Sequence, residues 1–214
     1  DFPNVDYNVT PERDWREIMA VVVLVDESSA VEGNDLTFDI SLVTFNDNTI
    51  PVQSASPIDI TFFTTDGTDA TSLYDVAISP FDYDAISNVS IAIPPFTETF
   101  EFTVTSFEDS IFEMDELFTL TGGITTANTI NTEVNAIGTI LDNDPEPSIS
   151  MNNDTVVEGE ELEFNIALSN PSSKPVDIEV VSSDFTAVSP EDYLPIDSAF
   201  TIEGTTNPAN PNLS

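Results

Sequence analysis

Five carboxylates lie within residues 107–120, among seven large apolar residues and without a Lys, Arg or His: Glu108, Asp109, Glu113, Asp115 and Glu116. Four interpretations of this stretch are open. As a structural element it is a helix with an apolar stripe or a solvated acidic loop. As a functional site it is the catalytic carboxylate pair of a glycosidase, in which one acid has a raised pKa, or a calcium site. A calcium site needs about six to eight oxygen ligands, which loops can supply.

The whole chain shares this excess of negative charge. Its 40 Asp and Glu face only 3 Lys and Arg, which gives a formal net charge of -37 over 214 residues. Repulsion of that size opposes compaction unless cations bind. The chain is nevertheless 40% hydrophobic with 15 Phe, which is not the composition of a disordered protein. Nucleic acid is excluded as a partner because its phosphates would be repelled.

Two residue types that carry much of enzyme and metal chemistry are missing. The chain has no Cys and no His, which excludes disulfides, thiolate and imidazole zinc sites, and Ser-His-Asp triads. We therefore expect no enzymatic role for this chain. The longest apolar run, residues 18–25, is strand-sized and falls far short of the roughly 20 residues of a membrane span, so direct membrane insertion is not expected.

Alternating apolar and polar residues predict the elements that position these acids. Leu36, Phe38, Ile40 and Leu42 alternate with polar residues, and the same period of two recurs in residues 58–62 and 100–104. Turn-forming clusters separate these segments. Short, regularly spaced strands of this kind predict an all-β sandwich.

An internal repeat divides the chain. Residues 30–42 match residues 156–168 at an offset of 126, and two further matches follow at offsets of 118 and 110, so the first copy carries two eight-residue insertions. We expect a linker or the tail of a preceding module in residues 1–17, a complete domain in 18–144 and a partial second domain in 145–214. The second copy is then either a piece of a longer protein or is completed by a strand from a neighbouring molecule.

Acidic residues fall at the ends of several predicted strands. Glu32 precedes one strand, Asp82 follows the insertion in residues 72–79, and residues 141–147 close the first copy. Antiparallel sandwiches bring alternate loops to one end, so these acids and those of residues 108–116 can share one ion cluster. The chain has no EF-hand loop, so such a site is assembled from distant segments.

Four motifs together resemble the Calx-beta family, in order and across one full copy: VEGNDLTFDISL, TTDGT followed by DY, FEDSIFEMDELFTLTG, and IGTILDND. The resemblance implies an immunoglobulin-like sandwich of about seven strands with Ca²⁺ bound at one end. The family's calcium ligands fall on Glu32, Asp82, Asp109, Glu113, Glu116, Asp142 and Asp144, with Glu108 in the place of an Asp, and in the second copy on Glu158 and Asp192. Ser110 and Asn143 replace acids of the richest sites, which implies fewer ions or weaker binding.

The resemblance also suggests a biological context. We expect a calcium-binding structural module of a large extracellular, bacterial surface adhesin or filament, in which calcium stiffens the tandem domains. Its partners would be calcium, the neighbouring domains, and other copies of the chain or a host or surface ligand. The alternatives are an accessory domain of a secreted enzyme and a calcium-sensing module of a membrane transporter.

Overall fold

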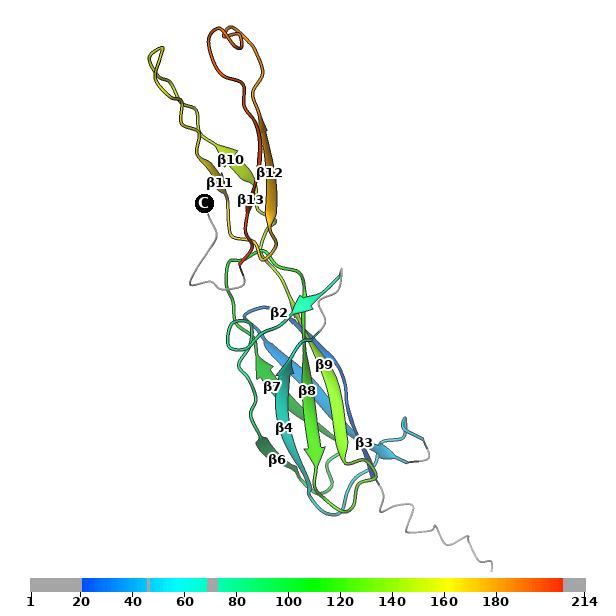
Figure 1. The fold of residues 1–214 in the computed structure, drawn as a ribbon. Coiled ribbons are helices and arrows are strands. Elements are labelled where there is room, and N and C mark those ends of the chain that lie inside the picture. The colour runs from blue at the N-terminus through cyan, green and yellow to red at the C-terminus, as the bar shows by residue number, and fades with distance from the viewer. Residues whose placement is uncertain (1–20, 46, 69–72, 206–214) are drawn as a thin grey trace, which may run out of the picture.

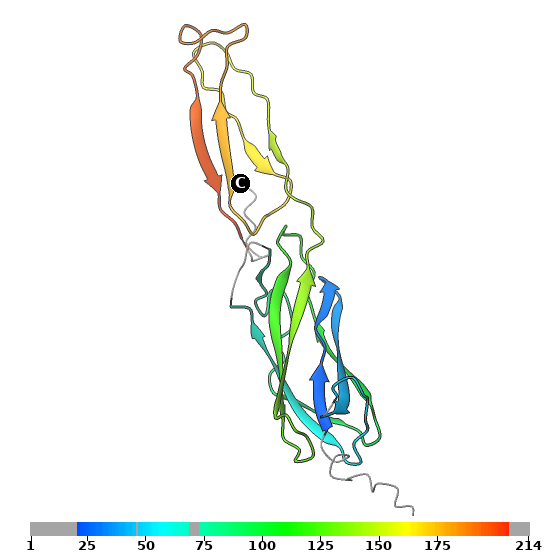
Figure 2. The same cartoon turned by 90° about the vertical axis from the view of Figure 1, so that its right-hand side faces the viewer.

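The computed structural model describes residues 21–45, 47–68 and 73–205, and these residues form only strands, turns and loops. Within these ranges, thirteen strands build two units that lie end to end (Figures 1 and 2). The all-β prediction is confirmed. Within the described ranges no helix is long and apolar enough to cross a membrane. The helical interpretation of residues 107–120 is wrong, because this stretch is a loop that leads into a strand.

One sheet of the first unit has three antiparallel strands. β3 (Asp35–Thr44) lies between β1 (Val21–Val25) and β7 (Thr99–Thr105). The second half of β3 pairs with β1, from Ile40 to Thr44, whereas its first half pairs with β7. Its alternating burial places Leu36, Phe38, Ile40 and Leu42 on the inner face, as the sequence pattern predicts.

The facing sheet follows the order β2-β9-β8-β4-β6. Its strands are β2 (Ser28–Val31), β4 (Ile58–Asp66), β6 (Val89–Ile93), β8 (Glu116–Ile124) and β9 (Glu133–Leu141). The short β5 (Asp75–Val76), which lies in the insertion of the first copy, adds to β8. Two of the pairings are parallel, β2 with β9 and β5 with β8, which the sequence pattern did not predict.

The two sheets enclose one hydrophobic core. The ring of Phe118 on β8 stacks on Tyr83 with 4.4 Å between centroids and meets Phe38 edge to face at 6.2 Å. Gly138 on β9 leaves space for this ring, since a Cβ there would lie 2.4 Å from the Phe118 Cζ. Packing of Tyr83 in the core therefore fixes the position of its neighbour Asp82.

The described part of the second unit, up to residue 205, contains two hairpins. β10 (Ile149–Met151) pairs with β11 (Ile166–Leu168), and β12 (Val176–Val181) pairs with β13 (Asp197–Ile202). The pair Ile149 and Leu168 repeats the pair Val23 and Leu42 of the first unit at the offset of 126. Only Leu168, Ile178 and Ile202 form a buried cluster among the described residues of this unit.

Local geometry also repeats between the units. Gly33 and Gly159 both have positive φ, at 77° and 91°. The Tyr83 hydroxyl donates to Asp66 at 2.6 Å, and the Tyr193 hydroxyl donates to Asp184 at 2.7 Å. The repeat found in the sequence is therefore also present in the local structure of the two units.

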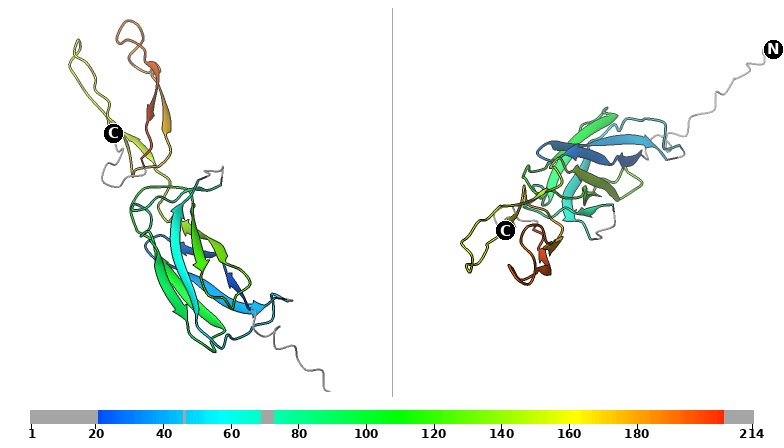
Figure 3. Two further views of the ribbon diagram at one scale, coloured as in Figure 1. Left: turned by 60° about the horizontal axis from the view of Figure 1, so that its bottom comes forward. Right: turned by 90° about the horizontal axis from the view of Figure 1, so that it is seen from above.

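The loop of residues 107–115 also contacts the second unit. The Phe112 amide donates to the Pro171 carbonyl at 3.0 Å, and the Ser173 amide donates to the Phe112 carbonyl at 2.9 Å. Lys174 forms an ion pair with Asp75 beside this contact. Figure 3 shows the two units from two further directions.

Candidate metal centre

Four segments bring acidic residues to the end of the first unit that faces the second unit. The parallel pairing of β2 with β9 explains two of them, because Val31 lies opposite Leu141 and both strands end at the same edge. The Glu32 amide donates to the Leu141 carbonyl at 3.0 Å. Glu32 and the segment of residues 142–144 are thus adjacent although more than a hundred positions separate them.

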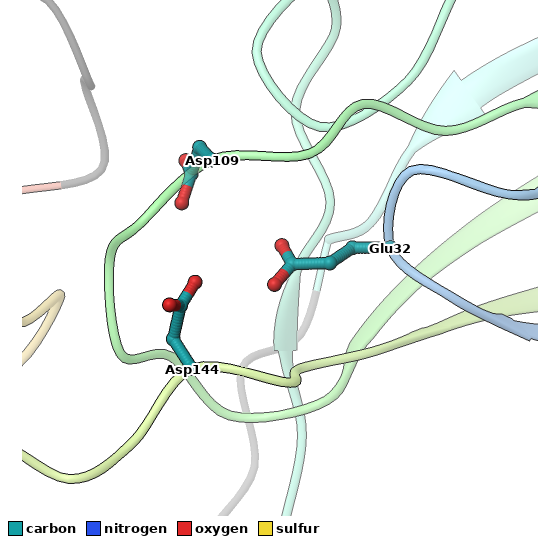
Figure 4. A group of neighbouring side chains, drawn as sticks. All are labelled: Glu32, Asp109 and Asp144. Carbon is teal, nitrogen blue, oxygen red and sulfur yellow. The ribbon is translucent and has the colours of Figure 1, made fainter.

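Glu32, Asp109 and Asp144 form the first group of acids. One carboxylate oxygen from each lies within 4.8 Å of the others, and the three side chains point toward one another from three separate loops (Figure 4). The Asn143 amide donates to Glu32 Oε1 at 3.3 Å, and the Ile111 amide donates to Asp109 Oδ1 at 2.7 Å. These backbone bonds orient two of the three carboxylates.

Asp82, Glu113 and Glu116 form the second group, with the same spacing of 4.8 Å or less between their oxygens. Glu116 is the first residue of β8, and Glu113 lies in the loop before it. The Ile78 amide donates to Asp82 Oδ2 at 2.5 Å, which fixes the turn that carries Asp82. The insertion in residues 72–79 therefore does not displace Asp82 from the site.

A small cavity of about 10 Å³ joins the two groups. Glu32 and Asp109 of the first group line this cavity together with all three acids of the second group and Asp142. Its apolar lining comes from Phe81, Phe107, Met114 and Ile140. Lys174 is the one Lys or Arg in the described part of the chain, and its ammonium pairs with Asp75, which is not a lining residue. No described side chain supplies a positive charge to this cavity.

Burial makes ionisation of these acids unfavourable. Burial first, and then the nearby charges of Asp82 and Glu113, raise the pKa of Glu116 to about 10. Burial likewise raises the pKa of Glu113 to about 8, with added repulsion from Asp82 and Asp109. The Glu113 Oε1 atom is buried without a hydrogen-bond partner.

The remaining acids show the same direction. Burial raises the pKa of Glu32 to about 8 and that of Asp82 to about 6, although a backbone hydrogen bond to each carboxylate opposes the shift. Burial also raises the pKa of Asp142 and of Asp144. Asp144 Oδ2 is a second buried oxygen without a partner. Repulsion among converging carboxylates adds to every one of these shifts.

Other predicted ligands lie outside the two groups. Glu108 is exposed; its Oε2 accepts from Asn143 Nδ2 at 3.2 Å and would lie 2.7 Å from a Cβ at Gly33. Glu158 and Asp192 of the second unit are exposed and belong to neither group of acids found among the described residues. The Val188 amide donates to Asp192 Oδ2 at 2.9 Å, as the Ile78 amide does to Asp82, but no acids converge there.

Sequence reasoning did not identify the residues that position the ligands. Asp115 Oδ1 accepts from the Asp142 amide at 3.2 Å, and the Asp115 carbonyl accepts from the Asp75 amide at 2.8 Å. Asp115 lies in the acidic stretch itself, but nothing in the pattern distinguishes it from the acids that line the cavity. The bond between Asp66 and Tyr83 likewise depends on a contact between distant segments.

No protein-family model matches the sequence. No curated protein matches it either. Among solved structures, the apo form of the Calx CBD1 domain aligns at 13% identity and a TM-score of 0.39, covering 58% of this chain and 99% of that one. CBD12 from CALX1.2 aligns at 15% identity and a TM-score of 0.37, covering 87% of this chain and 72% of that one. The class 5 fimbriae chaperone CfaA aligns at 13% identity and a TM-score of 0.39, covering 85% of this chain and 82% of that one. At these TM-scores the similarities assign neither a family nor a ligand to this chain.

Proposed function

We propose that the first unit binds calcium in the acidic cavity. The observation that carries this proposal is the convergence of two groups of buried and half-buried carboxylates at one cavity to which no described side chain brings positive charge. Buried ionised carboxylates are strongly unfavourable unless a cation compensates them. A divalent ion supplies the missing charge.

The donor set fits calcium. Every side-chain donor lining the cavity is a carboxylate oxygen, the hard ligand that calcium prefers, and the ligands come from separate loops that tolerate its irregular geometry. Glu113, which lines the cavity, and Asp144, which belongs to the first group of acids, each hold a buried oxygen without a partner, which an ion would satisfy. Magnesium demands a tighter octahedral arrangement and retains several waters, which suits a site lined by many carboxylates from separate loops less well.

A binding and structural role is also supported by the size of the cavity. Its volume of about 10 Å³ accommodates single atoms, whereas pockets for small-molecule substrates usually have about 300–1,000 Å³. We therefore propose no catalytic role for these acids.

Calcium bound here would stiffen the junction between the units. Asp109 and Glu113 flank Phe112, whose backbone bonds to Pro171 and Ser173 of the second unit. An ion bound by Asp109 and Glu113 would restrain the loop that carries Phe112, and would thereby also restrain the hydrogen bonds of Phe112 to the second unit. We propose a calcium-stiffened module of a large extracellular surface protein of the adhesin or filament type, where millimolar calcium suits sites of about 10⁻⁴–10⁻³ M affinity.

Thermal melting and isothermal titration calorimetry of the full chain test calcium binding. With calcium in hundredfold excess over its Kd, stabilisation of about 2.7 kcal/mol is expected relative to EDTA. The double variant Asp109→Asn/Glu116→Gln should lose this increment, because it removes one charge from each group. The matched control Asp39→Asn/Glu101→Gln, at exposed positions opposite each other on β3 and β7, should keep it. Equal melting temperatures in EDTA and in calcium contradict the proposal.

Hydrogen exchange tests the stiffening separately. Calcium should slow exchange of the Phe112 and Ser173 amides, because both bridge the units. Calcium binding without such protection would leave a calcium site that does not stiffen the junction.

A further inference from the structure

The outer face of the larger sheet in the first unit carries no charge over its middle. Its strands β4, β8 and β9 lie side by side (Figure 1). Between the two ends of the sheet, the residues that these strands turn outward are all uncharged: Thr61, Phe63, Thr65, Leu117, Thr119, Thr121, Asn135, Ile137 and Thr139. By contrast, the outer face of the three-stranded sheet carries Asp35, Asp39 and Glu101. An uncharged face is unusual in a chain in which 40 of 214 residues are acidic.

An aromatic ring protrudes from this uncharged face. Phe63 follows the buried Phe62 on β4, so its side chain points outward, where it is 39% exposed. Thr121 of β8 lies opposite Phe63, and Asn135 of β9 lies opposite Thr121. Because these neighbours have shorter side chains, the ring of Phe63 stands above them and is available for contact with another molecule.

The same face has a pocket of about 150 Å³. Its lining residues are Gly67, Thr68, Asp75, Leu117, Phe118, Thr119 and Ile137. Ile137 lies opposite Thr119 and is 41% exposed, and Asp75, the acid among these lining residues, is paired with Lys174. An apolar cavity of about 150 Å³ can hold a benzene ring. The pocket is therefore large enough for a phenyl side chain.

The ring and the pocket are arranged so that two copies can exchange them. Counted along β8 from Thr121, which lies opposite Phe63, Thr119 is about 7 Å and Leu117 about 14 Å away. A twofold axis that lies between two such faces and bisects the line from Phe63 to the pocket places each ring over the pocket of the other copy. In a twofold interface every contact is made twice.

We propose that two copies of this chain associate face to face through this sheet, with Phe63 of each copy inserted beside Leu117 and Ile137 of the other. Charge favours a second copy as the occupant. Chains with a net charge of -37 repel one another, but contact through this face places no carboxylates of the two copies against each other at its centre. Hydroxyl groups both donate and accept hydrogen bonds, so the Thr side chains of one copy are complementary to those of the other.

The size of the face is sufficient for a weak dimer. The flanking strands β2 and β6 extend it with the uncharged residues Ser29, Val31 and Ser90. Five strands spaced about 4.8 Å apart, with about seven residues of about 3.4 Å in each, cover about 600 Å² per copy. Two copies thus bury about 1,200 Å², at the lower end of standard interfaces. We therefore expect a dimer with a micromolar Kd.

Sedimentation velocity of the full chain tests this proposal, in EDTA and about 0.15 M salt, which screens repulsion beyond about 8 Å. The unmodified chain should show a monomer–dimer equilibrium. Thr65→Asp puts a charge at an exposed position next to Phe63 and should weaken association at least about tenfold, which corresponds to about 1.4 kcal/mol. Thr37→Asp, the same change at an exposed position on the opposite sheet, is the matched control and should associate normally. A chain that stays monomeric up to about 0.1 mM, or equal effects of the two variants, would overturn the proposal.

Disulfide trapping tests how the two faces meet. The chain has no Cys, so Phe63→Cys and Ile137→Cys each introduce a single thiol. In a mixed dimer of these variants, one Phe63 still enters an intact pocket, and the two thiols face each other at the second contact. Mild oxidation of an equal mixture should therefore give mainly the mixed disulfide, identified by mass spectrometry, and each variant alone should give little. Disulfides formed in random proportions would contradict the exchange of ring and pocket.

Salt and calcium separate this contact from ionic association. The proposed interface is uncharged at its centre, so association should strengthen when salt is raised from about 0.05 to 0.5 M, because salt screens the repulsion between the copies. Association that weakens with salt, or that appears only when calcium is added, would show bridging of carboxylates by ions and would overturn the proposal. Because dimer formation is measured in EDTA, its outcome is independent of calcium binding at the acidic cavity.

Discussion

Replacing Glu113 by glutamine changes stability in opposite directions with and without calcium. Glu113 is 7% exposed, its Oε1 has no hydrogen-bond partner, and its pKa is raised to about 8 by burial and by the neighbouring acids. Glutamine keeps the size of the side chain but carries no charge. In EDTA the variant should therefore be more stable than the parent chain, whereas in calcium it loses a ligand.

The size of the effect follows from the pKa. Each unit by which folding raises the pKa of a carboxyl destabilises its ionised form by about 1.4 kcal/mol. The pKa of the Glu113 carboxyl is near 4.5 in the unfolded chain and about 8 in the folded chain. Above pH 8 ionisation of this residue therefore lowers the free energy of unfolding of the metal-free fold by several kcal/mol. Because the amide of glutamine must itself be buried, we expect a net gain of about 1–3 kcal/mol at pH 8.5. At about 2.1 cal/mol/K per residue, this is about 4–11 °C for a unit the size of residues 21–144.

Differential scanning calorimetry in EDTA and in calcium at pH 8.5 measures both effects. Glu113→Gln should raise the melting temperature in EDTA and lose most of the increase that calcium produces in the parent chain. Glu101→Gln, on the exposed face of β7, should change neither quantity by more than about 2 °C. A Glu113→Gln variant that is less stable in EDTA and still gains the full calcium increment would refute the electrostatic account of the cavity.

Three further predictions address the pH dependence, the turn beside the site and the core beneath it. Because folding raises the pKa of the cavity acids, the metal-free fold binds more protons than the unfolded chain between about pH 4.5 and pH 8–10. Its stability should fall as pH rises through that window, so the calcium increment should be larger at pH 8.5 than at pH 5.5; an equal increment in melts at the two pH values would contradict this. Gly33→Ala introduces a Cβ at φ 77° and 2.7 Å from Glu108 Oε2, so it should destabilise by about 1–2 kcal/mol and weaken calcium binding in calorimetry. Gly159→Ala, at φ 91° with no atom within 4 Å, should leave calcium affinity unchanged. Phe118→Ala should lower the free energy of unfolding in urea by about 3–5 kcal/mol, since the ring is 1% exposed and stacks on Tyr83; a loss below about 1 kcal/mol would show that this packing does not support the site.

The faces of the strands in the first unit follow from the sequence, because a period of two leaves one arrangement that buries the apolar residues. Leu36, Phe38 and Ile40 alternate with polar residues and are 0% exposed. The same pattern in residues 161–168 predicts a strand of equal length, but only Ile166–Leu168 form one. Strand formation requires a neighbouring strand as well as a pattern. Among the described residues no strand pairs with residues 161–165, and the Glu163 and Asn165 amides donate instead to the side chains of Asp154 and Asn152 at 2.7 and 2.6 Å.

The sequence by itself determined the inventory of the site: an excess of carboxylates, no His or Cys, and acids at the ends of predicted strands. Which acids meet was decided by tertiary structure. Glu32 joins Asp144 because β2 and β9 run parallel and end together, and Glu113 joins Asp82 because the core fixes the loops that carry them. Glu158 lies in the same Val-Glu-Gly sequence as Glu32 but belongs to no group of converging acids among the described residues. Side chains from distant segments meet only when packed sheets fix the ends of their strands, and no local pattern encodes that distance.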